Sequence, residues 1–268
     1  MPAVVSRAVA REVGRARVMA HHIRTCVHRW GDPDPRRECQ RGASLMTAAS
    51  KNIAEGRDRV PRGIYLITPD WTNTARLESV VAAAIRGGAG AIQYRNKSAS
   101  ADLRREQGRV LVRLTQSPGL PFFVDDDAAL AIEVGADGLH IGRADGDPAE
   151  VRAKLLPAMM LGVSCYADPA LVAQAVRIGA TYVALGAMAA STTKPAAAIA
   201  PLECIGQARR LGAHVVASGG ITHINIERVA AAGAQAVGVV SAVFDDTEPM
   251  RATAELVARF ALGAQRRE

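Results

Sequence analysis

The sequence predicts a (β/α)8 barrel, the TIM-barrel fold, over residues 61–268, with a basic N-terminal extension over residues 1–60. Eight short apolar segments alternate with eight helix-like segments from residue 63 onward, which is the repeat that such a barrel requires. The apolar segments contain few polar residues, as is typical of strands covered on both faces. A doubly wound parallel sheet is the alternative, but it usually has fewer strands, and the first turn here lacks a G-x-G-x-x-G loop.

The expected strands are the apolar segments 63–68, 89–95, 121–125, 136–142, 159–164, 181–186, 214–220 and 236–241. The expected helices lie near residues 75–87, 101–116, 127–134, 148–156, 169–178, 200–211, 224–232 and 248–262. The first of these segments places five apolar residues on one helical face, namely Leu77, Val80, Val81, Ala84 and Ile85. Asp147 and Asp168 each precede a proline, and a capping carboxylate before proline at the first helical position is typical of a helix start.

Cysteine usage and hydropathy indicate a cytoplasmic protein. Cys26, Cys39, Cys165 and Cys204 form no C-x-x-C pair, so we expect reduced thiols and neither a disulfide framework nor a zinc site. No apolar run reaches the roughly 18 to 20 residues that a transmembrane helix needs, so we expect no membrane partner. Assembly into a homo-oligomer remains open.

The net charge of +7 belongs mainly to the extension. Residues 1–60 hold 12 Lys and Arg against 6 Asp and Glu, so the near-neutral barrel argues against a nucleic-acid partner. Residues 1–30 have the composition of a basic amphipathic helix, and prolines and glycines then interrupt regular structure. Five interpretations of the extension remain open: a transit peptide, a nucleic-acid arm, an anchor to an acidic surface, a disordered extension, and sequence upstream of a true start at Met46.

Polar residues gather at the carboxyl ends of the predicted strands, where barrel enzymes place their active sites. The second strand runs into QYRNK, which sets Gln93, Arg95 and Lys97 on alternate residues and therefore, in a strand, on one side. Such groups at the end of a buried strand are costly unless an anion lies against them. The other strand ends supply Asp125, Asp126, Asp127, Arg143, Asp145, Ser164, Ser191, Thr192, Thr193, Lys194, Gly219, Gly220, Val240 and Ser241.

Together these residues predict a metal site and two anion sites. Asp126 and Asp145, from adjacent strands, are suited to hold Mg²⁺, which keeps several waters and bridges to phosphate oxygens. Arg95, Lys97 and Lys194 are suited to surround a diphosphate. The glycine-rich turn after the seventh strand, with backbone N–H groups after the eighth, is the usual phosphate site of this fold.

Each group has a simpler interpretation when it is taken alone. Arg95 and Lys97 are also typical of a solvated rim, and one acid of the DDD run is expected to cap the next helix. His140 lies within an apolar strand and is expected to be a hydrogen-bonded core residue, and Cys165 is expected to be inert. The interpretation as one site depends on these groups meeting at one rim of a closed barrel.

Six motifs in order resemble the thiamine phosphate synthase family over about residues 63–244. They are QYRNK, VDDDAALAIEVGADGLHIGRAD, LGVSCY, YVALGAMAASTTKP, ASGGIT and VGVVSAVF. The family joins 4-amino-5-hydroxymethyl-2-methylpyrimidine diphosphate to 4-methyl-5-(2-hydroxyethyl)thiazole phosphate, which gives thiamine phosphate and diphosphate. Its reaction is held to be dissociative, so it needs placed charge and aligned substrates more than acid–base groups.

The resemblance implies three groups of functional residues. The Mg²⁺ ligands would be Asp126 and Asp145. The catalytic residues, which would act on the leaving diphosphate, would be Arg95, Lys97, Ser164 and Lys194. The substrate-binding residues would be Gln93, Arg95, Lys97, Asp125, Ser164, Ser191, Thr193, Lys194, Gly220, Val240 and Ser241, with Ser191, Thr193 and the backbone of the last three at the thiazole phosphate.

The sequence departs from the family pattern at four places, of which one, Asn96 in place of a frequent Glu, is expected to matter little. Asp125 stands where the family usually has Asn, and this third carboxylate would either tighten metal binding or repel the diphosphate. Arg143 replaces the usual Gln and is expected to offset that acid electrostatically. The run GAMAAS replaces one usually like G-P-I-F-P-T, which predicts a wider or looser thiazole pocket and leaves a slow or altered-substrate enzyme open.

Two other functions remain open. Thiazole tautomerases share the barrel but tend to lack the diphosphate and metal residues, and they use a His in the segment that reads SCY here, so the sequence favours the synthase. A non-catalytic homologue that binds a phosphate ligand is the other alternative, and the altered run before Ser191 is its main support.

Overall fold

The computed structural model describes residues 60–191 and 197–266, which contain a closed barrel of eight parallel strands. The strands are β1 (Gly63–Ile67), β2 (Ala91–Tyr94), β3 (Phe122–Asp125), β4 (Gly138–Ile141), β5 (Met160–Tyr166), β6 (Tyr182–Leu185), β7 (Val215–Ser218) and β8 (Ala236–Val239). β1 pairs with both β2 and β8, and this pairing closes the ring. The predicted barrel is confirmed and the doubly wound sheet is excluded. The extension expected over residues 1–60 lies, up to residue 59, outside the described residues.

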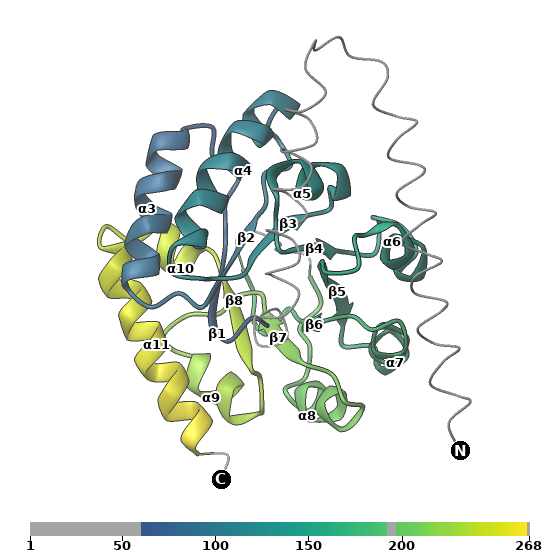
Figure 1. Cartoon of the computed structure of the whole chain (residues 1–268). Helices are drawn as coiled ribbons and strands as arrows, with labels where there is room; N and C mark the ends of the chain where they lie inside the picture. The colour runs from purple at the N-terminus through teal and green to yellow at the C-terminus, as the bar shows by residue number, and fades with distance from the viewer. Residues whose placement is uncertain (1–59, 192–196, 267–268) are drawn as a thin grey trace, which may run out of the picture. The chain divides into compact units, whose positions relative to one another are not determined.

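Helices connect the strands and surround the ring (Figure 1). They are α3 (Thr74–Arg86), α4 (Ala101–Gln116), α5 (Ala128–Val134), α6 (Pro148–Lys154), α7 (Pro169–Arg177), α8 (Glu203–Arg210), α9 (Ile226–Ala231), α10 (Ser241–Phe244) and α11 (Pro249–Gln265). Asp147 and Asp168 cap α6 and α7 as predicted, because each carboxylate accepts a backbone N–H bond of 2.8 Å two residues later. Among the described helices, none has the length and apolar character needed to cross a membrane.

The short helix α10 corrects the prediction at the end of the barrel. We expected the eighth strand to run to residue 241, but β8 ends at Val239 and Ser241 already belongs to α10. Val240 and Ser241 therefore form a turn from strand to helix. The run Ala236–Phe244 stays apolar across this turn, so periodicity over so short a helix gives no signal of the change.

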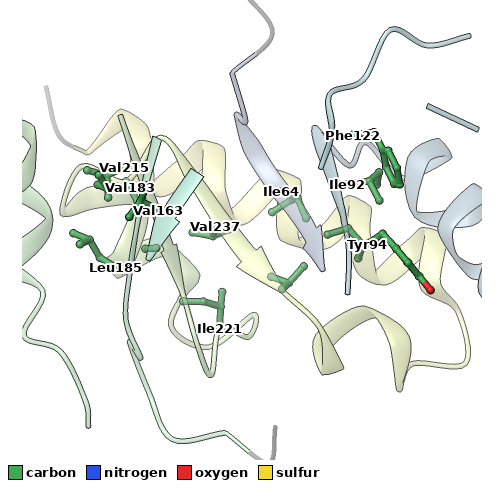
Figure 2. Packing of buried hydrophobic residues seen from close by; sticks show 14 of the residues in the cluster. Ile64, Ile92, Tyr94, Phe122, Val163, Val183, Leu185, Val215, Ile221 and Val237 are labelled. Atoms are coloured by element: carbon green, nitrogen blue, oxygen red, sulfur yellow. The ribbon is translucent and has the colours of Figure 1, made fainter. Parts of the chain in front are cut away.

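Apolar side chains fill the space between the strands and the helices. Figure 2 shows Ile64, Ile92 and Val237 among the residues of this layer, and all three are fully buried. They lie on the neighbouring strands β1, β2 and β8. Because successive side chains of a strand point to opposite faces, the residues next to them point into the barrel.

Three aromatic rings fill the interior of the barrel. Tyr65, Phe123 and Tyr182 meet pairwise edge to face, with centroids 5.3 to 5.7 Å apart. Each such contact contributes about 0.5–1.5 kcal/mol beyond the burial of apolar area. Glycines on β4 and β5 provide the space that these rings occupy. A Cβ at Gly138 would overlap Phe123, and a Cβ at Gly162 would overlap Tyr182. Two of these rings, Tyr65 and Tyr182, form the floor of the cavity at the rim.

Candidate active site

A cavity of about 340 Å³ opens at the carboxyl ends of the strands. Eleven of the thirteen residues expected in the site line it, namely Gln93, Arg95, Lys97, Asp125, Asp126, Asp145, Ser164, Ser191, Gly220, Val240 and Ser241. The other two, Thr193 and Lys194, lie outside the described residues. The polar residues that are scattered over the sequence therefore meet at one rim, as the sequence interpretation required.

The QYRNK segment reaches the cavity differently from the prediction. β2 ends at Tyr94, so Gln93 belongs to the strand while Arg95 and Lys97 lie in the loop that follows. Thr68 holds this loop, because its hydroxyl donates to the Arg95 carbonyl at 2.9 Å and accepts from the Arg95 N–H at 2.8 Å. The three side chains share the cavity through this anchoring and not through the alternation of a strand.

Carboxylates hold two of the cavity's cations. Arg95 Nη1 lies 3.0 Å from Asp70 Oδ1, and Arg95 Nε lies 3.6 Å from Asp125 Oδ2. Lys97 pairs with Asp126, and this bond is the main cause that raises the pKa of the Lys97 ammonium. The guanidinium of Arg95 thus pairs with the extra acid Asp125, and the electrostatic offset expected from Arg143 stays a prediction.

Asp70 is a supporting residue that sequence reasoning missed, and Asn96 is a second one, although it was expected to matter little. The Asp70 carboxylate binds Arg95 and also accepts the backbone N–H of Lys97 at 3.0 Å. Asn96 is buried and donates to the Trp71 carbonyl at 2.8 Å and to Gln107 at 3.0 Å. Asp70 comes shortly after the first strand in the sequence. Its expected place at the rim was the signal that could have identified it as a site residue.

Asp126 and Asp145 meet side by side at the cavity. Asp126 has a left-handed backbone, with φ of 65°, and its N–H donates to the His140 carbonyl at 2.8 Å. Asp145 Oδ2 accepts the Gly142 N–H at 2.6 Å. Burial raises the pKa of the Asp145 carboxyl, its hydrogen bond to the Asp126 carboxyl raises it further, and the Gly142 N–H opposes both. Two carboxyl groups held together in this way favour a cation between them.

These two carboxylates fit Mg²⁺ better than an ion enclosed by protein. In the part of the chain that the structure describes, no group of three or more His, Cys, Asp or Glu side chains is placed to hold a metal ion. Mg²⁺ is commonly bound through one or two carboxylates, with water and substrate phosphates as its other ligands. The Lys97 ammonium beside Asp126 shows that this position already accepts a positive charge.

Arg143 lies at the cavity in an arrangement that the sequence did not predict. Its guanidinium carbon lies 4.6 Å from the centroid of the Tyr166 ring, and its backbone N–H donates to Tyr166 Oη at 3.4 Å. No carboxylate among the described residues lies within ion-pairing distance of Arg143. Its donors therefore remain available to an anion that enters the cavity.

The floor of the cavity is a hydrogen-bonded network of Gln93, Tyr65, Tyr182, His140 and Ser164. His140 is 7% exposed and both of its ring nitrogens have partners, which agrees with the expected hydrogen-bonded core residue. It also lines the cavity, which that expectation did not include. Tyr65 and Tyr182 lie within the expected strands 63–68 and 181–186, where no polar pattern marks them as cavity residues.

The turn after β7 and the run before Ser191 form another part of the wall. Gly219 and Gly220 have φ of 87° and 65°, and a Cβ at either position would crowd the backbone of residues 187–190. The Met188 and Ala189 N–H groups both reach the Gly219 carbonyl, at 3.1 and 3.0 Å. Backbone bonds thus fasten the GAMAAS run, in which the proline and the aromatic residue expected for the family are missing.

Comparison with known proteins points to the same family that the sequence motifs resemble. The model of the family "Thiamine monophosphate synthase" matches residues 64–243. The thiamine-phosphate synthase of Chromobacterium violaceum is 45% identical over 198 residues, which are 74% of this chain and 96% of that protein. The thiamine-phosphate synthase of Bordetella bronchiseptica is 44% identical over 211 residues, which are 76% of this chain and 97% of that protein.

A solved structure supports this assignment. The thiamine phosphate pyrophosphorylase from Pyrococcus furiosus superimposes with a TM-score of 0.67 and is 32% identical. The superposition covers 76% of this chain and 97% of that one. The family model and relatives of this identity, matched over nearly their whole length, show that the chain belongs to the thiamine monophosphate synthase family.

Proposed function

We propose that this protein is a transferase that makes thiamine phosphate. It would join hydroxymethylpyrimidine diphosphate to hydroxyethylthiazole phosphate and release diphosphate. One observation carries the proposal: in a chain of this family, nine residues expected at the two substrates and the two expected metal ligands line a single cavity. The cavity combines acids, cations and a glycine turn, which suits two phosphorylated substrates and a divalent ion.

The pyrimidine diphosphate would lie against the acids and cations of the rim. Asp126 and Asp145 would hold Mg²⁺, which when bound supplies positive charge to the oxygens of the leaving diphosphate. Arg95, Lys97 and Ser164 would donate hydrogen bonds to the same oxygens. The Lys97–Asp126 pair would open as the anion enters, because the ammonium then gains a more highly charged partner.

The reaction needs charge stabilisation more than proton transfer. The bond between the pyrimidine methylene carbon and the diphosphate oxygen breaks, and the bonding electron pair leaves with the diphosphate. The thiazole nitrogen then supplies the electron pair of the new carbon–nitrogen bond. Donors placed before the reaction lower this barrier because they need not reorient as charge develops. The ion pairs of Arg95 hold its guanidinium in place in this way.

The thiazole phosphate would bind at the glycine turn and the start of α10. Gly220, Val240 and Ser241 line the cavity there, and so does Ser191. Thr193 and Lys194 remain part of this proposal as residues for the thiazole phosphate and the diphosphate. The cytoplasm is proposed as the location, and the buried free thiols of Cys165 and Cys204 agree with reduced cysteines.

Product analysis tests the proposal. Purified protein with both substrates and Mg²⁺ should form thiamine phosphate and diphosphate in equal amounts, and EDTA should stop the reaction. Full activity in EDTA would contradict the metal assignment and leave the transferase intact. Isomerisation of a thiazole carboxylate without use of the pyrimidine would indicate a tautomerase, and binding without diphosphate release would indicate a non-catalytic homologue. Either of these two results would overturn the proposed function.

A further inference from the structure

A chain of four hydrogen bonds crosses the floor of the cavity. Gln93 Nε2 donates to Tyr65 Oη at 3.3 Å, and Tyr65 Oη lies 2.9 Å from Tyr182 Oη. Tyr182 Oη lies 2.9 Å from His140 Nδ1, and His140 Nε2 lies 2.9 Å from Ser164 Oγ. Its five residues come from five strands, so the barrel itself holds the chain together.

Burial keeps the two phenols of this chain protonated. Tyr65 and Tyr182 are each 1% exposed, and desolvation raises the pKa of both hydroxyls well above the ordinary value. Each phenol therefore has one proton to donate and lone pairs to accept. His140 stacks on Tyr182 with an angle of 14° between the rings, which limits rotation of the imidazole.

These donors and acceptors can be arranged in one direction along the chain. The Gln93 amide nitrogen only donates, so Tyr65 Oη accepts there. Among the described residues the Tyr65 hydroxyl has one other partner, and its proton must therefore go to Tyr182 Oη. Tyr182 in turn donates to His140 Nδ1. In the opposite direction the Tyr65 proton would have no acceptor among the described residues, and because Tyr65 is only 1% exposed, that direction is unfavourable.

This direction decides which imidazole nitrogen carries the proton. If Nδ1 accepts from Tyr182, the neutral His140 ring is protonated at Nε2 and donates to Ser164 Oγ. The Ser164 oxygen is then an acceptor within the chain, and its own proton is left to point into the cavity that Ser164 lines. With the reverse order, the Ser164 proton would point at His140, and a lone pair would face the cavity.

We propose that Tyr65, Tyr182 and His140 are positioning residues that make the Ser164 hydroxyl a hydrogen-bond donor to an anion in the cavity. The identity of that anion, diphosphate, rests on the proposed function. An oxyanion needs donors, so a Ser164 oxygen turned the other way would repel it. The three residues thus act on the anion through Ser164 without touching it.

The tautomer of His140 is the direct test, because it can be read without turnover. In protein labelled with ¹⁵N-histidine, NMR above the titration of the imidazole should show the His140 proton on Nε2. His140→Asn identifies the signal by its loss. Tyr182→Phe removes the donor to Nδ1 and should move part of the population to the Nδ1–H form. The control is Tyr94→Phe, which removes a buried hydroxyl that donates to Gln107 and does not belong to this hydrogen-bond chain. It should leave the His140 spectrum unchanged.

A double-mutant cycle tests the link to the anion. Inorganic diphosphate with Mg²⁺ is titrated into the protein, and Tyr182→Phe should weaken binding by about 5- to 10-fold. In a Ser164→Ala background the same Tyr182→Phe change should have almost no further effect, because Ser164 is the group through which Tyr182 acts.

Three results would overturn the inference: a His140 proton on Nδ1 in the unaltered protein, an equal effect of Tyr182→Phe with and without the Ser164 hydroxyl, or no diphosphate binding by the unaltered protein. The proposed function would fail separately, if the tautomer and the cycle behaved as expected but no thiamine phosphate formed.

Discussion

At the scale of single residues, the cations among the described cavity residues differ in whether a carboxylate already pairs with them. Arg95 and Lys97 have carboxylate partners, whereas the Arg143 guanidinium rests on the Tyr166 ring. In the proposed function, an incoming diphosphate would compete with the carboxylates for the first two. It would bind Arg143 without breaking an ion pair, so we expect Arg143 to be the departure from the family pattern with the clearest effect on substrate affinity.

Arg143→Gln should therefore raise KM for the pyrimidine diphosphate by about 10-fold, the effect of one charged hydrogen bond, and leave kcat within about 2-fold. The salt dependence of KM should also become weaker, because one cation is lost. Steady-state kinetics at several ionic strengths measures both effects. Arg105→Gln is the matched control, since Arg105 lies on α4 and pairs with Asp102 and Glu133. An unchanged KM in Arg143→Gln would show that the guanidinium does not reach the substrate.

Cys165 is the residue whose chemistry burial suppresses most clearly. Desolvation, with a smaller contribution from Asp168, raises the pKa of its thiol to about 12. Because a raised pKa favours the protonated thiol, almost no thiolate forms in mildly alkaline buffer. The Cys165 peptide should remain unlabelled by iodoacetamide in the native protein and become labelled in urea, as mass spectrometry can measure. Equally fast labelling in both states would contradict the burial of this thiol.

At the scale of elements, glycines in the strands decide whether the aromatic interior can form. Gly162 on β5 faces the Tyr182 ring, and a methyl group there would overlap it. Gly162→Ala should lower the free energy of unfolding by about 1–3 kcal/mol through overpacking. It should also disturb the network that reaches His140 and Ser164. Urea unfolding gives the first effect and diphosphate binding gives the second.

The control for this change is Gly206→Ala on α8. A Cβ at Gly206 meets only the end of the Arg210 side chain, at 3.6 Å. Because alanine favours a helix over glycine, this variant should be neutral or more stable by up to about 1 kcal/mol. Equal stability of the Gly162→Ala and Gly206→Ala variants would show that the space beside the Tyr182 ring does not require a glycine at position 162.

The elements also show how far the sequence alone could lead. Alternating apolar and helical segments predicted the barrel, because a parallel strand buried on both faces is a short apolar run that can be recognised in the local sequence. The rim residues followed from the fold, since parallel strands bring their carboxyl ends together. The partners of those residues did not follow. That Arg95 pairs with Asp70, or that Tyr182 lies between Tyr65 and His140, depends on the shear and packing of the closed barrel, which no local pattern encodes.

At the scale of the whole molecule, the matched relatives correspond to the barrel and not to the full chain. The family model begins at residue 64, and 74% of this chain covers 96% of the Chromobacterium violaceum protein. A chain that starts at Met46 should therefore keep the thermal midpoint and the kcat/KM of the full chain. Loss of the folded state or of activity on this truncation would show that residues 1–45 contribute to the barrel.

The central claim is that acidic and cationic side chains, which follow different strands, act together on one diphosphate and its metal. Asp126 and Asp127 are neighbours in the chain, but Asp126 lines the cavity while Asp127 caps α5 and pairs with Arg104. An asparagine keeps the helix cap, so Asp127→Asn should change kcat by less than about 2-fold. Asp126→Asn should lower kcat by about 10²- to 10³-fold and demand more Mg²⁺.

The measurement that tests this claim most directly is the rate of thiamine phosphate formation against Mg²⁺ concentration for these two variants. A large loss confined to Asp126→Asn is the predicted result. Equal rates in the two variants would contradict a metal and diphosphate site at this rim.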